Sequence, residues 1–162
     1  MRLLRADISH LPFITEVYNA SIPSRISTAD PHPVSVESRM EWFVKHGPER
    51  PLYIIEEDGL HIGWAGFSDF YGRPAYKGTA EVSIYLLEAH QFRGIGRQVM
   101  QELIRLAPAL GITTLLAFVF SENKASVKLM EKSGFETWGV LPGVAAMDNQ
   151  KIDLTILGRK VS

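Results

Sequence analysis

The hydrophobic positions at the N-terminus predict a strand followed by a helix. Residues 2–5 are expected to form a short first strand. Asp7 or Ser9 can cap the helix that follows, because both side chains accept hydrogen bonds from backbone N–H groups at a helix start. The apolar residues of this helix recur at a spacing of three to four positions, and they are Leu11, Ile14, Val17 and Tyr18.

A polar, proline-containing segment separates this helix from a second one. Residues 22–34 hold three prolines among serine, threonine and aspartate residues, which predicts a loop. The second helix is predicted to begin at Ser35 and to end before Gly47-Pro48. Its apolar side consists of Met40, Trp42, Phe43 and Val44. We interpret the adjacent Trp42 and Phe43 as helix core rather than as a platform for a ligand.

The middle of the chain predicts three strands in a row. A hairpin turn is expected at the Glu-Asp-Gly sequence of residues 57–59, and a loop with a glycine and a proline at residues 71–77. The three predicted strands are residues 52–56, 62–70 and 79–87.

The remaining segments predict a sheet with helices on it. Helices are expected at residues 95–110 and after Asn123, the second ending at Ser133-Gly134. Residues 112–120 form a near-continuous apolar run, typical of a strand buried on both faces. Two closing strands are predicted at 135–140 and 152–157, joined by a loop around residues 141–143. The order β-α-α-β-β-β-α-β-α-β-β indicates an α/β domain with a mixed sheet, covering residues 1–162 as one domain.

Composition narrows the classes of function. The chain has 162 residues, no cysteine and a formal net charge of −1. We therefore expect no disulfide, no thiolate metal site and no surface for nucleic acid or an acidic membrane. The five histidines are scattered, so no metal site is expected. No signal peptide or transmembrane-length apolar run is found, and a cytoplasmic location is expected.

The most informative segment is the turn at residues 91–97, between the strand at 79–87 and the helix at 95–110. Gly94 and Gly96 allow close backbone approach at a helix start, where the N–H groups and the helix dipole favour an anion. Arg93 and Arg97 add positive charge, which predicts a phosphate-binding turn. Val99 stands where a dinucleotide fingerprint requires glycine or alanine, and the Gly-Lys-Ser/Thr of a P-loop is missing. An ordinary glycine-rich turn remains the alternative.

The sequence Gln91-Phe92-Arg93-Gly94-Ile95-Gly96 resembles the pyrophosphate loop of the GNAT N-acyltransferases, Gln/Arg-x-x-Gly-x-Gly/Ala. The element order is also that of the GNAT fold, whose central sheet is mixed, mostly antiparallel and flanked by helices. Within the family, the chain is most similar to the phosphinothricin and methionine sulfoximine N-acetyltransferases. The segments that carry this likeness are residues 17–19, 35–43, 80–86, 123–126, 133–135 and 152–154.

The resemblance implies acetyl-CoA as co-substrate and no metal. Ile84, Tyr85 and Leu86 would lie along the pantetheine arm, bound by backbone hydrogen bonds, and Asn123 would anchor that arm from the next helix. The pyrophosphate would be held by the backbone of Phe92, Arg93, Gly94, Ile95, Gly96 and Arg97. Each residue also has a structural explanation: Ile84 and Leu86 suit a core, and Asn123 suits a helix cap.

The resemblance implies that Glu81 is the general base that deprotonates the acceptor amine. Among apolar neighbours its carboxyl is expected to be partly buried with a raised pKa, although a solvated strand end is the alternative. A backbone N–H near Leu86 would polarise the thioester carbonyl. Met130 stands where relatives carry a Tyr or His acid, so no general acid is assigned. The family likeness also implies a bulge in this strand, which would place Glu81 and Tyr85 on different faces.

The acceptor site is implied at Arg73, Ala75, Tyr76 and Lys77, where Arg73 or Lys77 could pair with a carboxylate. Residues 147–153 lack the family's Trp and Arg, so the pocket is expected to differ. The expected function is acetyl transfer to the primary amine of a small molecule, such as an amino acid or a phosphinothricin or methionine sulfoximine analogue. A protein N-terminal or lysine acetyltransferase and a non-catalytic acyl-CoA sensor are the alternatives. A homodimer is expected from the family.

Overall fold

The computed structural model describes residues 1–161, and its strands form one seven-stranded sheet in the order β1-β2-β3-β4-β5-β7-β6. Only the β4–β5 pair is parallel, and the other pairs are antiparallel. The predicted mixed, mostly antiparallel sheet is thereby confirmed. The strands are β1 (Arg2–Arg5), β2 (Leu52–Glu57), β3 (Leu60–Asp69), β4 (Thr79–Leu86), β5 (Thr114–Phe120), β6 (Glu136–Met147) and β7 (Gln150–Lys160).

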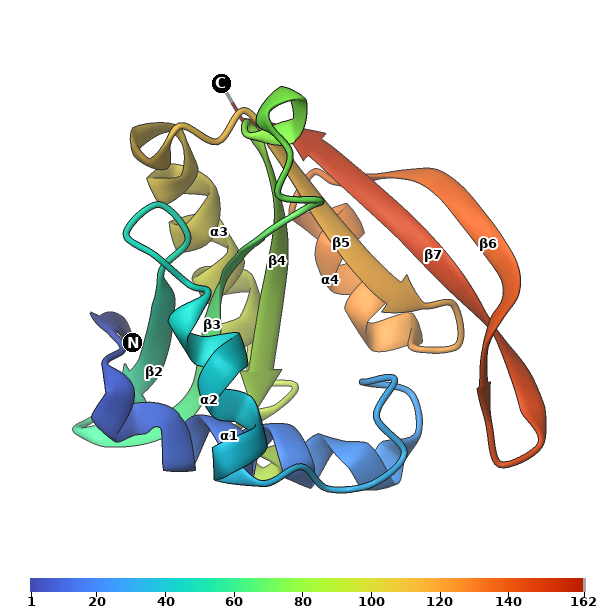
Figure 1. Cartoon of the computed structure of the whole chain (residues 1–162), viewed down its shortest axis with the longest axis horizontal. Helices are drawn as coiled ribbons and strands as arrows, with labels where there is room; N and C mark the ends of the chain where they lie inside the picture. Colours follow the sequence, from blue (N-terminus) through green and yellow to red (C-terminus); the bar gives the residue numbers. More distant parts are fainter. Residues whose placement is uncertain (162) are drawn as a thin grey trace.

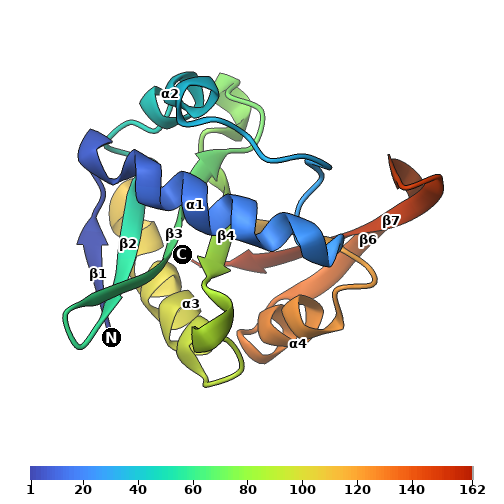
Figure 2. The ribbon, with the colours of Figure 1, turned by 90° about the horizontal axis from the view of Figure 1, so that it is seen from below.

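Four α-helices flank the sheet: α1 (Leu11–Ser21), α2 (Val36–Val44), α3 (Ile95–Leu106) and α4 (Lys124–Lys132). Figure 2 shows α1 and α2 on one side of the sheet and α3 and α4 on the other. Each side has its own core, because alternate residues of a strand face opposite ways. Trp64 of β3 packs towards α1, whereas Phe67 packs towards α3. No helix within residues 1–161 is long and apolar enough to cross a membrane.

The two central strands pair only at their beginnings. Residues Thr79, Ala80 and Glu81 of β4 face Thr114, Leu115 and Leu116 of β5. Beyond this point β4 stays paired with β3, and β5 stays paired with β7. The strands therefore diverge, and Figure 1 shows them opening towards their carboxyl ends. The sheet is split there into two parts, and each part faces the opening with a strand edge that has no partner strand.

The C-terminal hairpin differs from its prediction. Residues 141–143 were expected to be a loop between two short strands, but β6 continues through them to Met147. Its register against β7 shifts between Leu141 and Ala145, so Pro142 lies in an irregular stretch of an edge strand. Proline is tolerated at such a position because its missing N–H costs no hydrogen bond to a second neighbour. The true turn is Asp148-Asn149, where both residues have positive φ angles, 52° and 61°.

The other boundaries shift by a few residues. The predicted helix at 95–110 changes to a 3-10 turn from Ala107 to Leu110, where Pro108 lacks an N–H for the α-helical pattern. The predicted hairpin turn is confirmed at Asp58-Gly59, with φ angles of 51° and 80°. Asp7 caps a short 3-10 turn, Ile8–His10, that precedes α1.

Candidate active site

Glu81 lies at the point where β4 and β5 separate. It is the last β4 residue paired with β5, opposite Leu116, and on its other side it faces Ser68 of β3. Its side chain is half-buried and forms no hydrogen bond or ion pair within residues 1–161. Desolvation raises the pKa of its carboxyl above the ordinary glutamate value. A half-buried, unpartnered carboxylate at a strand junction is suited to accept a proton.

Tyr85 lies on the same face of β4 as Glu81. The β3–β4 register is continuous from Gly63–Leu86 to Asp69–Ala80, so the bulge implied by the family likeness is absent from this pairing. The Tyr85 ring stacks on Trp64, with centroids 4.9 Å apart. Burial raises its pKa, and the charges of Tyr18 and Glu81 add to the effect. Its phenol therefore stays protonated at neutral pH.

The carboxyl half of β4 offers a free backbone edge. Residues 82–86 are paired with β3 on one side and have no strand partner on the β5 side, although the Leu86 carbonyl accepts a hydrogen bond from the Gln91 side-chain amide at 2.9 Å. The side chains of Ile84 and Leu86 pack against the α3-side core, which fixes this edge in place. An extended molecule with amide groups can pair with such an edge as an added strand. The predicted pantetheine residues Ile84, Tyr85 and Leu86 all lie along it.

The turn that opens α3 has the geometry of an anion site. Phe92 and Gly94 both have positive φ angles, 60° and 81°. None of the backbone N–H groups of residues 92–97 has a hydrogen-bond partner among the described residues. A row of free N–H groups at a helix start attracts an anion. The positive φ of a phenylalanine is strained, and strain of this kind concentrates at functional sites.

The side chains of residues 92–97 differ in burial and in ion pairing. Ile95 is buried in the core, so only its N–H faces outward. Phe92 is 89% exposed. Arg93 pairs with Glu57 of β2 at 3.1 Å, whereas the exposed Arg97 forms no ion pair within residues 1–161. The backbone thus provides most of the anion site, and the two arginines contribute unequally to its charge.

The Asn123 side chain forms two hydrogen bonds at the start of α4. Its side-chain oxygen accepts a hydrogen bond from the Ser126 N–H at 3.2 Å, which makes it the helix cap. Its amide group donates to the Ile26 carbonyl at 3.2 Å. The structural explanation is therefore correct, and the amide nitrogen keeps a second hydrogen that forms no bond within residues 1–161.

Residues 22–34, which we call the strap, reach across the opening between β4 and β5 (Figure 1). At its far side Arg25 pairs with Asp148 of the β6–β7 turn at 3.2 Å. In its middle the Tyr85 hydroxyl donates to the Ser27 carbonyl at 3.3 Å, and the Tyr18 hydroxyl donates to Asp30. The sequence predicted a loop here, but no local signal showed that it would cross the site.

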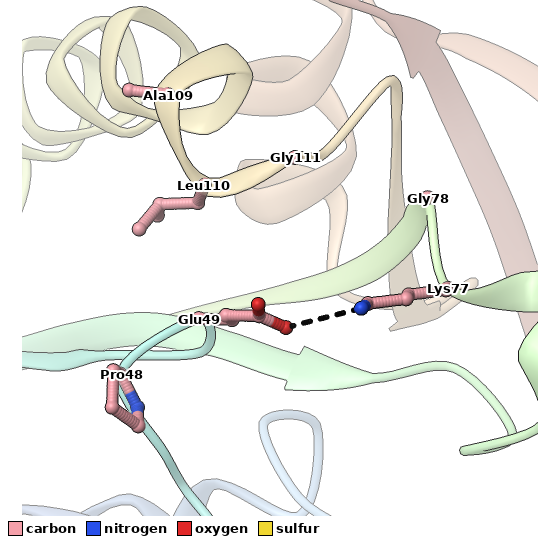
Figure 3. A pocket seen from close by; sticks show the side chains of 7 residues that line it. All are labelled: Pro48, Glu49, Lys77, Gly78, Ala109, Leu110 and Gly111. Atoms are coloured by element: carbon pink, nitrogen blue, oxygen red, sulfur yellow. Dashed lines mark ion pairs between the residues drawn. The ribbon is translucent and has the colours of Figure 1, made fainter.

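The predicted acceptor residues Arg73, Ala75, Tyr76 and Lys77 are all exposed on the β3–β4 connection. The buried Arg50 holds this connection, because its guanidinium donates to the Lys77 carbonyl at 2.5 Å and pairs with Asp69 at 2.9 Å. A cavity of about 500 Å³ lies beside Lys77. Figure 3 shows the Lys77 ammonium inside it, paired with Glu49 at 3.9 Å. Glu81 does not line this cavity, so the cavity is separate from the proposed base.

Met130 is buried in the α3-side core, at 6% exposure. It is a packing residue of α4 and has no proton to donate. No group of three or more potential metal ligands gathers within residues 1–161.

Residues 14–135 match the acetyltransferase (GNAT) family. The chain is 51% identical to the Bacillus subtilis (strain 168) protein "Putative phosphinothricin acetyltransferase YwnH", over 100% of both chains. It is 29% identical to the L-methionine sulfoximine/L-methionine sulfone acetyltransferase of Salmonella typhimurium, over 97% of this chain and 92% of the relative. The structure of Salmonella typhimurium yncA with its cofactor acetyl-CoA superposes with a TM-score of 0.91 at 28% identity, covering 100% and 94% of the two chains.

Proposed function

The chain is a member of the acetyltransferase (GNAT) family, and we propose that its acceptor is the primary amine of a small molecule, an amino acid or an analogue of one. Family membership makes it an acetyl-CoA-dependent acetyltransferase. The observation that carries the acceptor proposal is the position of Glu81, a half-buried carboxylate where β4 and β5 separate. This position brings a base to the closed end of the opening, within reach of a compact amine.

We assign the remaining roles from the same geometry. The free edge of Ile84, Tyr85 and Leu86 holds the pantetheine arm, and the N–H groups of residues 92–97 hold the pyrophosphate. Glu81 takes a proton from the acceptor ammonium, directly or through water, so that the neutral amine can attack. The N–H of Leu86 polarises the acyl carbonyl. Asn123 donates the second hydrogen of its side-chain amide to the pantetheine arm.

A small acceptor fits better than a protein. The strap crosses the opening, and its contacts to Tyr85, Asn123 and Asp148 restrict the space beside Glu81. A protein N-terminus or lysine would have to displace these contacts. A sensor without turnover has no use for an unpartnered carboxylate at Glu81. The Salmonella typhimurium relative is an L-methionine sulfoximine/L-methionine sulfone acetyltransferase, which supports the same class of acceptor here.

We further propose that residues 1–162 form one domain that works as a cytoplasmic homodimer. The edge strand β6 exposes the apolar side chains of Val140, Leu141 and Val144, and an exposed apolar edge strand suits contact with a second copy. Acetyl-CoA is made inside cells, which supports the location. Sedimentation equilibrium tests the dimer, and a Val140→Asp/Val144→Asp double variant should sediment as a monomer.

The acceptor proposal is tested by thiol release from acetyl-CoA with a panel of amines. The panel contains the common L-amino acids, phosphinothricin, methionine sulfoximine and short peptides with free N-termini. Release with one or more of the amino acids or analogues, at rates well above those with peptides, is the expected result. Faster acetylation of peptides would favour the protein acetyltransferase. Binding of acetyl-CoA without turnover on any amine would favour the sensor.

A further inference from the structure

Arg39 is a half-buried arginine without a counter-ion. It lies in the first turn of α2, and its guanidinium carbon is 3.7 Å from the centroid of the Trp42 ring and 4.5 Å from that of Tyr18. Its Nε is fully buried and has no hydrogen-bond partner. Within residues 1–161 no carboxylate lies within 4 Å of its guanidinium. The cation stacks on the faces of two aromatic rings, and Asp30 attracts it at longer range without forming an ion pair.

The buried Arg50, unlike Arg39, has an ion-pair partner and hydrogen-bond acceptors. Arg50 is also buried, and its guanidinium has an ion pair with Asp69 and two backbone carbonyls, of Glu49 and Lys77. Arg39 has none of these, although burial of an unpaired cation is costly. A guanidinium that stacks through its faces keeps the N–H groups of its edge available for a planar anion. Such an arginine is suited to bind an anion.

Arg39 lies on the same side of the sheet as Glu81. Its ring partner Tyr18 packs against Tyr85, with centroids 5.4 Å apart, and Tyr85 shares the face of β4 that carries Glu81. The Asp30 carboxylate attracts the Arg39 cation at longer range, and it accepts the hydrogen bond of the Tyr18 hydroxyl. The rings of Tyr18 and Tyr85 thus lie between the Arg39 guanidinium and the face of β4 that carries Glu81.

We propose that Arg39 binds an anionic group of the acceptor and so determines which amines the enzyme accepts. This inference rests on the proposed small-molecule acetyltransferase activity. A zwitterionic acceptor would place its ammonium towards Glu81 and its anion at Arg39, because each pole is attracted to one residue and repelled by the other. The anion is either the main-chain carboxylate of an amino acid or an acidic group on its side chain, and both are planar or tetrahedral oxyanions that a guanidinium binds.

The basic residues predicted for this task are less suited to it. Arg73 and Lys77 are exposed, and Lys77 already pairs with Glu49. An exposed ion pair is screened by water and salt, whereas a half-buried guanidinium loses less of its attraction. Arg39 was not singled out from the sequence, although its spacing of three from Trp42 on one helix face is a signal for stacking.

The test compares acids with their amides. The best amino-acid acceptor of the wild type is assayed beside its carboxamide and, where its side chain is acidic, beside the analogue neutralised at that position. Arg39→Met should raise the acceptor KM for the anionic compound about tenfold or more and leave the KM for the matched neutral compound within twofold. The KM of Arg39→Lys for the anionic compound should lie between those of the wild type and Arg39→Met. The KM for acetyl-CoA should not change, and Arg105→Met, which removes an exposed arginine from α3, should change nothing.

The outcomes separate this inference from the proposed function. If the wild type acetylates no small amine, the proposed function is wrong. If the wild type acetylates amines but Arg39→Met raises the KM of acid and amide equally, Arg39 only packs α2 and the inference is overturned. The neutral acceptor reports on folding in every variant. If Arg39→Met does not fold, the Arg39→Lys variant decides: it must lower the preference for acid over amide.

Discussion

Glu81 and Tyr85 lie four residues apart on one face of β4, with no bulge between them in the β3–β4 register. The carboxyl of Glu81 contributes to the raised pKa of the Tyr85 phenol, after the larger effects of burial and Tyr18. The proposed base and the Tyr85 hydroxyl therefore lie on the same side of the sheet. Substitutions of Glu81 and Tyr85, measured as pH–rate profiles, can therefore test which group moves each proton.

Glu81→Gln is expected to lower kcat about 10²-fold or more at neutral pH, the usual contribution of a positioned base. The acetyl-CoA KM should not change. Because burial raises the pKa of Glu81, the acidic limb of the wild-type kcat/KM profile should lie above the ordinary glutamate value of 4.5 and be absent from the variant. A variant with a near-normal rate and profile would assign the base to another group.

The same substitution is expected to stabilise the fold. Between the ordinary and the raised pKa of Glu81, the folded state binds more protons than the unfolded state, so stability falls as pH rises through this interval. Glutamine has no charge to bury. The Tm of Glu81→Gln should therefore exceed that of the wild type at pH 7–8 and match it at pH 4, each 1 kcal/mol being about 2–4 °C. Equal Tm values at all pH values would contradict a buried, unpaired carboxylate.

Met130→Leu should leave kcat within a few-fold, because the swap nearly conserves volume in the core and removes no proton donor. A CoA thiolate with a pKa of about 8.5 can leave without an enzyme acid. The kcat profile should then have no falling alkaline limb from the protein. A falling limb that persists in Met130→Leu and disappears in Tyr85→Phe would identify Tyr85 as the acid.

Gly96→Val is expected to reduce acetyl-CoA affinity at least tenfold in a folded protein, measured by calorimetry. A Cβ on Gly96 would lie 3.2 Å from a terminal methyl of Leu129, which can move aside. The branched side chain would then crowd the N–H groups of residues 92–97. Gly47→Ala is the control, since its Cβ would meet nothing within 4 Å. Unchanged affinity in folded Gly96→Val would remove the pyrophosphate assignment.

Arg50→Met is expected to destabilise the protein by about 2–3 kcal/mol, because it leaves the Lys77 carbonyl without its charged donor and breaks the Asp69 pair. Denaturant unfolding measures this. Arg2→Met, which removes an exposed arginine from its pair with the largely buried Glu56, should cost about 1 kcal/mol or less. Equal losses in the two variants would mean that Arg50 contributes no more than a surface arginine.

The elements, the positive-φ turn before α3 and the partial burial of Glu81 could be predicted because their signals are local: apolar periodicity, glycines at a helix start, and one carboxylate in an apolar strand. The separation of β4 from β5 could not be predicted. The apolar sequence of β5 is equally compatible with a β4 that pairs along its whole length and with one that pairs only at its beginning. Pro142 suggested a loop because the edge position that tolerates it depends on the whole sheet. Arg39 was missed for the same reason: its lack of a partner depends on residues distant in sequence.

The strap also has a consequence for how the protein opens. None of residues 23–33 is buried, and the strap is held mainly by single polar contacts, one of which joins Asn123 to Ile26 across 97 positions of sequence. Such contacts form late in folding, because closing a long loop has a high entropic cost and one hydrogen bond offsets little of it. They also break first, so the strap should exchange its amide hydrogens by local opening while the strands beneath it remain protected. The strap would then open as a unit of its own while strands β4 and β5 beneath it stay folded.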